Sequence, residues 1–120
     1  MNFTKQEYKT RLKKVQNSMQ EKGIELLISH DTANMNYLTG YDAWSFYYAQ
    51  AVIVHVNAEE PLCWVRKQDS GGAYIKTYLK KENIIAYEEK YIHTWPLHPY
   101  DNLVEIIREK KWDKLSIGLE

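Results

Sequence analysis

The chain has 120 residues, with 16 basic and 16 acidic side chains, so its formal net charge is zero. This length fits one domain that buries roughly two-thirds of its unfolded surface. The balanced charge gives no long-range field that would favour nucleic acid or an anionic membrane. The longest apolar runs are far below the roughly 20 residues that span a bilayer. We therefore expect neither a nucleic-acid partner nor a membrane partner.

The N-terminal residues and the single cysteine indicate a cytoplasmic protein. The N-terminus is rich in Lys but amphipathic, without the continuous apolar core of a signal peptide. The single cysteine, Cys63, cannot form an internal disulfide, which is typical of a reducing compartment. Ten Tyr and four Trp exceed the needs of a small core. Some of these rings are therefore expected at a partner surface.

The first third of the chain predicts a helix, a strand and a second, shorter helix. Thr4 and Glu7 have the form of a capping box, in which each side chain bonds the backbone N–H of the other residue. An apolar stripe at helical spacing then continues until Gly23, which can end the helix in the left-handed conformation. The stripe consists of Tyr8, Leu12, Val15 and Met19. Residues 24–29 are expected to form a buried strand, and Asp31 to cap a short helix.

The middle of the chain predicts a central hairpin. Residues 45–56 have two largely apolar faces in their second half, which is typical of a strand covered on both sides. Turn residues at 57–60 and an apolar run over residues 61–66 predict a second strand after a four-residue loop. At the corner that follows, Arg66 and Asp69 are expected to contact each other.

Helices and strands continue to alternate in the last part of the chain. A helix capped by Asp69 or Ser70 is expected to include Ala73, Tyr74 and residues 77–79, and a strand is expected over residues 83–87. Two prolines make residues 88–100 irregular. Asp101 is expected to open a helix, and residues 114–119 to form a closing strand. This alternation predicts an α/β domain around a mixed sheet.

The residues themselves show no catalytic machinery. The four histidines are His30, His55, His93 and His98. The last two lie in a proline-containing loop without a nearby cysteine, so two loop histidines are a better interpretation than a zinc site. Cys63 lies inside a predicted strand and is interpreted as a small buried hydrophobe rather than a nucleophile. No Gly-x-Ser-x-Gly or Gly-rich phosphate motif occurs. We expect no catalytic residue, metal or cofactor within this chain.

The candidate for a functional surface is the aromatic segment at residues 41–48. It combines several rings with one carboxylate, and its candidate site residues are Asp42, Trp44, Phe46 and Tyr48. In one interpretation the rings belong to the core and Asp42 forms a turn. In the other they line a neighbouring pocket or pack across a dimer. The residue types alone leave both interpretations open.

Several motifs occur in an order and spacing that match a known family. The first helix and strand of that family are matched by Arg11-Leu12 and Gly23-Ile24. Its most recognisable motif is matched by Asp31 together with residues 34–41. Its closing strand is matched by Ile117-Gly118-x-Glu120. This set resembles the N-terminal domain of the creatinase, prolidase and aminopeptidase P family. The aromatic segment looks most similar to that of ectoine hydrolases and creatinases, and Xaa-Pro dipeptidases are the broader label.

The resemblance implies a three-layer α/β/α fold with a mixed central sheet, similar to ribonuclease H. It implies that residues 1–120 are the N-terminal domain and that a pita-bread catalytic domain is absent from this chain. In the family that domain carries two Asp, one His and two Glu, which bind divalent metals such as Mn, Co or Zn where a metal is used. None of those ligand motifs occurs here. The implied partners are the parent's own catalytic domain and a second copy in a homodimer.

The resemblance also implies a role for the aromatic segment. In this family the loop can reach the partner subunit's active site, and in creatinase a Phe and an Arg from it grip the substrate carboxylate. The Phe corresponds to Phe46, but Tyr48 stands where the Arg would be. A phenol cannot give a carboxylate the charged two-donor contact of Arg, which argues against creatine as the substrate. With Asp42 and Trp44, these residues are expected to bind substrate in the parent, across the dimer.

The sequence thus predicts a non-catalytic N-terminal domain that contributes to dimerisation and to substrate access in a parent hydrolase. The parent is expected to hydrolyse a C–N bond, in Xaa-Pro peptides or in a small amidine or cyclic amino acid such as ectoine. Two other readings remain open. The chain could be a stand-alone α/β binding or scaffolding module without enzymatic activity, or, less simply, an autonomous small enzyme.

Overall fold

A mixed sheet of five strands forms the centre of the part of the protein that the computed structural model describes, which is residues 3–41, 49–92 and 97–120. Its strands are β1 (Leu26–Ser29), β2 (Ala51–His55), β3 (Leu62–Arg66), β4 (Ile84–Tyr87) and β5 (Ile117–Leu119). Their order across the sheet is β4-β3-β2-β1-β5. β2 runs antiparallel to both of its neighbours, whereas the outer strands β4 and β5 run parallel to theirs.

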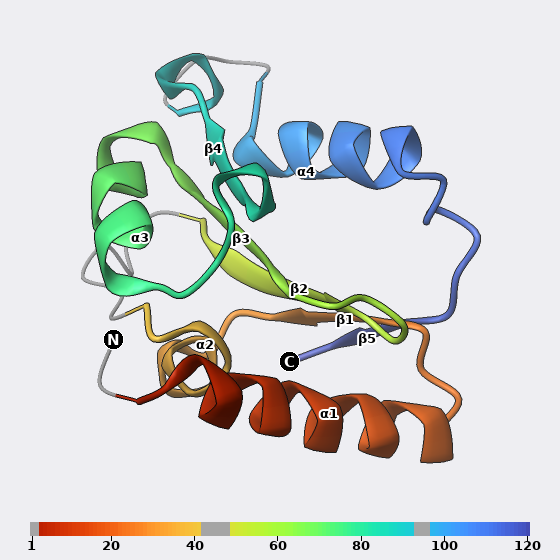
Figure 1. Ribbon diagram of the computed structural model, residues 1–120. Helices are drawn as coiled ribbons and strands as arrows, with labels where there is room; N and C mark the ends of the chain where they lie inside the picture. The colour runs from red at the N-terminus through yellow and green to blue at the C-terminus, as the bar shows by residue number, and fades with distance from the viewer. Residues whose placement is uncertain (1–2, 42–48, 93–96) are drawn as a thin grey trace.

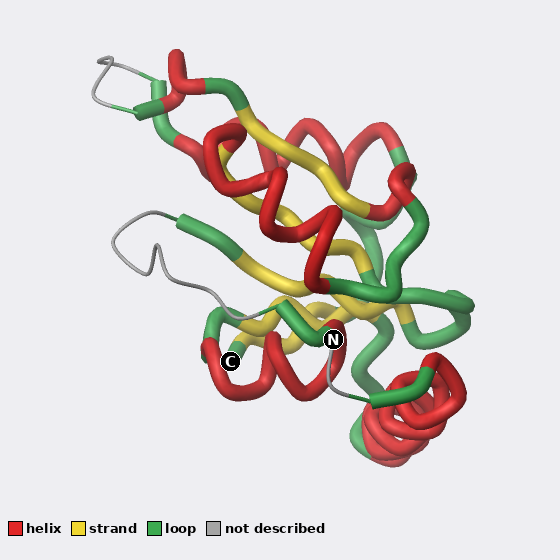
Figure 2. The backbone as a smooth tube through the Cα atoms, turned by 60° about the vertical axis from the view of Figure 1, so that its left-hand side comes forward, coloured by secondary structure: helices red, strands yellow, loops and turns green. Residues whose placement is uncertain are grey.

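Helices cover both faces of this sheet, so the expected three-layer α/β/α architecture is confirmed (Figures 1 and 2). The helices are α1 (Lys5–Glu21), α2 (Thr32–Thr39), α3 (Ser70–Lys76) and α4 (Pro99–Glu109). The first three pack on one face and α4 on the other. Short 3-10 helices are found at Lys67–Asp69, Lys81–Asn83 and Glu89–Tyr91. In the described part of the chain, no helix is long and apolar enough to cross a membrane.

The central strand β2 supplies side chains to a hydrophobic cluster on each face of the sheet. Val52 and Val54 point to the cluster under α1, α2 and α3, and Ala51 and Ile53 to the cluster under α4. All four are at most 1% exposed. The prediction that this strand is covered on both sides is therefore confirmed, because a strand between two helical layers has no face left for solvent.

Two predicted N-caps are confirmed, although the expected capping box at Thr4 is only half formed, since the Glu7 carboxylate accepts from Arg11 Nε instead. The Thr4 side chain accepts from the backbone N–H of Glu7, and the Asp31 carboxylate accepts from that of Ala33. α2 ends at Gly40, whose φ of 85° is a left-handed conformation that favours glycine. The first two helices therefore follow local sequence rules closely.

The prediction of a strand over residues 45–56 was too long. β2 begins only at Ala51, where it pairs with Trp64, and residues 45–48 lie outside the described part of the chain. The carbonyl of Ala49 is bonded by the Tyr87 hydroxyl at 2.5 Å, so this residue is held by a side chain rather than by the ladder. β2 also ends one residue early, at His55, whose carbonyl accepts from the Ala58 N–H in the turn that follows.

Two further expectations need correction, and the expected contact between Arg66 and Asp69 stays a prediction. α4 begins at Pro99 rather than Asp101, because the His98 side chain caps it and the Asp101 carboxylate bonds back to the His98 N–H. α3 ends at Lys76, so the apolar residues at 77–79 follow it in a loop. Arg66 pairs with Glu89 at 2.8 Å. The side chain of Asp69, its expected partner, lies outside the described part of the structure.

Candidate functional site

The four predicted site residues Asp42, Trp44, Phe46 and Tyr48 all lie outside the described residues. The structure does describe both ends of the segment that carries them. Tyr41 on one side is 3% exposed and Gln50 on the other is 6% exposed. The two described ends of the candidate segment therefore lie in the core, one after α2 and the other just before β2.

Tyr41 anchors the first end of the segment. Its N–H donates to the Thr39 hydroxyl at 3.0 Å, and that hydroxyl in turn donates to the Met35 carbonyl. Its ring lies against α3, because a Cβ added at Gly72 would be 3.8 Å from the Tyr41 Cε1 atom. The chain direction at this end is thus set by a buried ring and a buried hydroxyl.

An aromatic cluster supports the other end. We define it as His30, Trp64, Tyr87, His98 and Tyr100. The indole of Trp64 lies 4.9 Å from the Tyr87 ring and 5.5 Å from the Tyr100 ring, between centroids. Trp64 and Tyr87 are fully buried, whereas Tyr100 is 39% exposed. Because the Tyr87 hydroxyl bonds the Ala49 carbonyl, the cluster fixes the place where the candidate segment re-enters the sheet.

The side-chain polar atoms of His30, Trp64, Tyr87 and Tyr100 have defined partners. The Trp64 Nε1–H donates to Asn102 Oδ1 at 2.9 Å, which ties the sheet to the first turns of α4. His30 Nδ1 lies 3.2 Å from the backbone oxygen of Glu120, which can only accept, so Nδ1 carries the hydrogen. The neutral ring then accepts from the Tyr100 hydroxyl through Nε2, at 2.6 Å. Burial raises the pKa of Tyr100 above its ordinary value.

The described histidines and the cysteine have structural roles. The His55 Nδ1 accepts from the Asn57 N–H while its ring lies 5.1 Å from Trp112, and His98 caps α4. Cys63 is fully buried, and desolvation raises the pKa of its thiol to about 12. This confirms its interpretation as a small buried hydrophobe, since a thiol that stays protonated is a poor nucleophile. His93 lies outside the described residues.

A metal centre does not fit the described part of the chain. No group of three or more His, Cys, Asp or Glu side chains there could hold an ion. The described residues can hold the two ends of the segment 42–48 in place, but they contain no set of side chains that could bind a metal ion.

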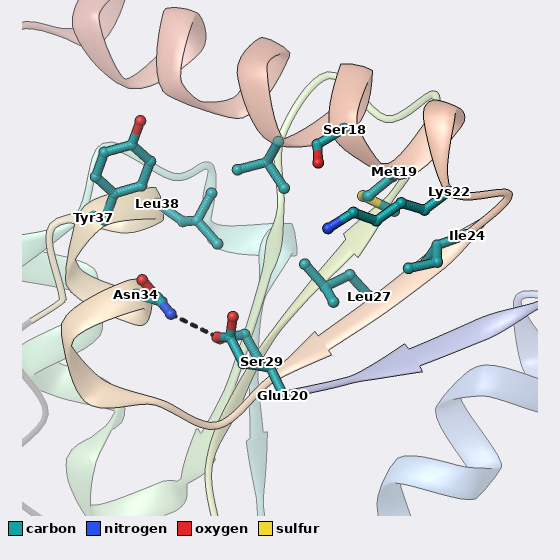
Figure 3. Close-up of a pocket in the computed structure, with 11 residues that line it drawn as sticks. Ser18, Met19, Lys22, Ile24, Leu27, Ser29, Asn34, Tyr37, Leu38 and Glu120 are labelled. Carbon is teal, nitrogen blue, oxygen red and sulfur yellow. Dashed lines mark hydrogen bonds between the residues drawn. The ribbon is translucent and has the colours of Figure 1, made fainter.

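A groove of about 260 Å³ opens between α1, α2 and β1 (Figure 3). Its apolar lining comes from Val15, Met19, Ile24, Leu27 and Leu38. Lys22 extends over it from the end of α1, and the side chains of Glu120 and Asn34 meet at its other end (Figure 3). Glu120 Oε1 accepts from Asn34 Nδ2 at 2.8 Å and from the Ser29 hydroxyl. One carboxylate thus links the ends of β1 and β5 to α2.

Sequence reasoning missed both the aromatic cluster and the Glu120 network. His30 and Tyr100 are 70 residues apart, and Asn34 and Glu120 are 86 residues apart. No local spacing rule connects residues at such distances. The helix α4 was expected, but the signal for its start was Pro99, which favours the first position of a helix as well as breaking regular structure.

The model of the family described as the Creatinase/Prolidase N-terminal domain matches residues 11–120. This chain belongs to the creatinase/prolidase N-terminal domain family. An ectoine hydrolase from Halomonas elongata is 37% identical to this domain over 119 residues, which cover 98% of the chain. The domain spans 30% of the length of that relative.

Solved structures confirm the fold of this creatinase/prolidase N-terminal domain. A proline dipeptidase from Streptococcus pneumoniae superposes with a TM-score of 0.70 at 14% identity, covering 91% of this chain and 72% of that chain. The Creatinase/Prolidase N-terminal domain of an X-Pro dipeptidase from Streptococcus pyogenes gives 0.65, also at 14% identity, with 92% of this chain and 99% of that chain covered. At such low identity these likenesses bear on the fold alone.

Proposed function

We propose that this domain is the non-catalytic N-terminal part of a longer hydrolase and that its segment 42–48 shapes access to the parent's active site. The proposal is supported by the 30% share of the ectoine hydrolase that the chain spans. It is also consistent with the described residues, which offer no ligand set for a metal. In this proposal the parent's catalytic domain carries out the hydrolysis, and the N-terminal domain helps to position the substrate.

The main support for this proposal is that both ends of the candidate segment are held by buried residues. Tyr41 is buried against α3 on one side, and Ala49 is held by the buried Tyr87 on the other. Four of the seven residues between 42 and 48 are aromatic. A short segment whose ends are fixed by packed groups can present its rings at a defined place, which is what a substrate-binding surface needs.

The substrate class we propose for the parent is a small cyclic amino acid or amidine, such as ectoine, rather than an Xaa-Pro peptide. The identity to an ectoine hydrolase supports this choice. A small zwitterion bound between Trp44 and Phe46 would have its cationic part over an aromatic face, an arrangement worth about 0.5–2 kcal/mol. In the proposed homodimer, the segment of one subunit reaches the active site of the other. We place the parent in the cytoplasm, where Cys63 stays reduced.

The first experiment is to read the source gene past the codon for Glu120 and to express the complete open reading frame. Ring opening of ectoine and cleavage of Ala-Pro are then measured on the wild type, Trp44→Ala and Phe46→Ala. We expect the variants to lower kcat/KM for ectoine about tenfold or more, or about 1.4 kcal/mol, with a melting temperature within about 2 °C of wild type.

Trp112→Ala is the matched control, because Trp112 is partly exposed and packs on His55 near the far end of α4. Removing it should lower the melting temperature and leave kcat/KM unchanged. Unchanged kinetics for Trp44→Ala together with a large fall in melting temperature would instead assign the ring to the core. A stop codon after Glu120 would favour the stand-alone binding or scaffolding module. Activity on Ala-Pro alone would restore the dipeptidase assignment.

A further inference from the structure

Two buried glutamines differ in their hydrogen bonding. Gln16 and Gln50 are each 6% exposed. The Gln16 Nε2 donates to the carbonyls of His55 and Ala58, at 3.0 and 2.8 Å. Among the described residues, neither Nε2 nor Oε1 of Gln50 has a hydrogen-bond partner, although both atoms are closed to solvent. Gln50 therefore carries a buried amide whose hydrogen bonds the described residues do not supply.

This lack of a partner is exceptional in the described part of the chain. Its other buried polar side chains are hydrogen-bonded, namely those of Gln16, Ser29, Thr39, Glu60 and Thr77. The Tyr78 hydroxyl is the one other enclosed side-chain atom there without a partner. A buried donor or acceptor without a partner lowers stability, and an amide has two N–H donors and one acceptor oxygen. Such a residue points to a function that stability alone does not explain.

Gln50 lies at the end of the candidate segment 42–48. Ala49 and Ala51 pack with the cluster under α4. Because side chains alternate along an extended chain, Gln50 between them faces the opposite side of the sheet, which α1, α2 and α3 cover. Tyr41, at the other end of the segment, packs in the cluster on that same side. The segment thus begins at a buried ring and ends at a buried amide on one face of the sheet.

We propose that Gln50 is a positioning residue for the parent's substrate. Its amide forms hydrogen bonds with backbone groups of the segment 42–48 when substrate is bound, and so holds the rings of Trp44 and Phe46 against the substrate. The proposal rests on the role proposed above for this segment. Backbone N–H and C=O groups match both the acceptor and the donors of an amide. A neutral amide also makes these bonds without burying a charge.

A permanently bound water is the competing explanation for the buried amide, since buried waters commonly satisfy such groups. The two explanations predict opposite effects on stability. If a water always bonds the amide, removing the amide should lower stability. If the partners of the amide arrive only with substrate, removing it should raise the stability of the substrate-free protein and weaken substrate binding.

Gln50→Met tests the sign of the stability effect, with Gln16→Met as the matched control. Met has nearly the length of Gln but none of its hydrogen-bonding groups, and both glutamines are equally buried. In thermal unfolding of the 120-residue chain, we expect Gln50→Met to raise the melting temperature by about 3 °C or more. Gln16→Met, which leaves two carbonyls without their donor, should lower it by about as much. A fall in melting temperature for Gln50→Met would overturn the proposal.

The kinetics of the complete parent on ectoine test the positioning role. We expect Gln50→Met to raise KM about tenfold with a smaller change in kcat, and Gln16→Met to change neither constant. A purely structural residue would not raise both the melting temperature and KM. An unchanged KM for Gln50→Met, together with a lowered kcat/KM for Trp44→Ala, would overturn this inference and leave the proposed function standing. Unchanged kinetics for Gln50→Met, Trp44→Ala and Phe46→Ala would overturn both.

Discussion

Asn34 and Glu120 are 86 residues apart in the sequence, and the Asn34 Nδ2 donates to Glu120 Oε1 at 2.8 Å. The same amide nitrogen donates to Asp31 Oδ2 at 3.2 Å, and Glu120 Oε1 also accepts from the Ser29 hydroxyl. A neutral group with two hydrogens thus separates two carboxylates. This arrangement holds the first turn of α2 against the ends of β1 and β5.

Asn34→Asp should destabilise the domain more than Asn34→Ala. The alanine variant loses two hydrogen bonds of a partly exposed group, which costs about 1 kcal/mol. The aspartate variant adds a charge between Asp31 and Glu120 and should cost about 1–2 kcal/mol at pH 7. Urea unfolding measures both values. The excess cost of Asn34→Asp should decline as the pH falls below about 4, because the introduced carboxylate then takes up a proton. An excess that persists there would contradict the charge explanation.

The hydrogen bond from the Trp64 indole to Asn102 should contribute more to stability than a hydrogen bond at the surface, because the indole is fully buried. Asn102→Leu leaves the Trp64 N–H without its partner and should lower the free energy of unfolding by about 1–3 kcal/mol. Asn102→Asp is the matched control, since it keeps an acceptor in the first turns of α4, where a negative charge is favourable. A double-mutant cycle with Trp64→Phe should show coupling of about 1 kcal/mol. Additive losses would mean that the bond contributes nothing.

The elements that obey local rules could be predicted from the sequence. Thr4, Asp31 and Gly40 mark helix ends by capping and by a left-handed conformation, both of which depend on neighbouring residues only. The end of β2 could not be predicted in this way. It depends on the turn in which the His55 carbonyl accepts from the Ala58 N–H, and on the buried Gln16, whose amide donates to the carbonyls of His55 and Ala58.

The start of α4 was missed for a different reason. His98 is an unusual N-cap, and Pro99 was interpreted as a breaker although it occupies the first turn of the helix. Glu60 likewise was interpreted only as a turn residue. It is 8% exposed and accepts from the Lys80 N–H and from Asn83, which lie 20 and 23 residues away. Such roles arise only when distant segments meet.

Alkaline pH should destabilise the domain through Cys63. Burial raises the pKa of this thiol to about 12, so between about pH 9 and 12 the unfolded chain loses the proton while the folded chain keeps it. The unfolded state then binds fewer protons, and stability falls as pH rises, by about 1.4 kcal/mol per unit for this group. Burial also raises the pKa of Tyr78 and Tyr100, which act in the same direction.

Cys63→Ala isolates this contribution. Urea unfolding between pH 8 and about pH 11 should show a shallower loss of stability for the variant than for the wild type, although the variant begins from a lower value because of the lost packing. The native thiol should also resist alkylation at pH 8 and react in urea. Rapid alkylation of the folded protein would show that Cys63 is accessible, contrary to its full burial.

The hydrogen bonds of His30 should fix its tautomer. Because the Glu120 backbone oxygen can only accept, the neutral ring carries its hydrogen on Nδ1 and accepts from Tyr100 at Nε2. Long-range ¹H–¹⁵N spectra at pH 8 should therefore show a protonated Nδ1 and a bare Nε2. Tyr100→Phe keeps the ring packing but removes the donor, so both tautomers should then be populated, with a loss of about 1 kcal/mol or less in stability. Tyr74→Phe, on an exposed tyrosine of α3, should change neither property. A wild-type spectrum with Nε2 protonated would contradict the link between β1, β5 and α4 through His30.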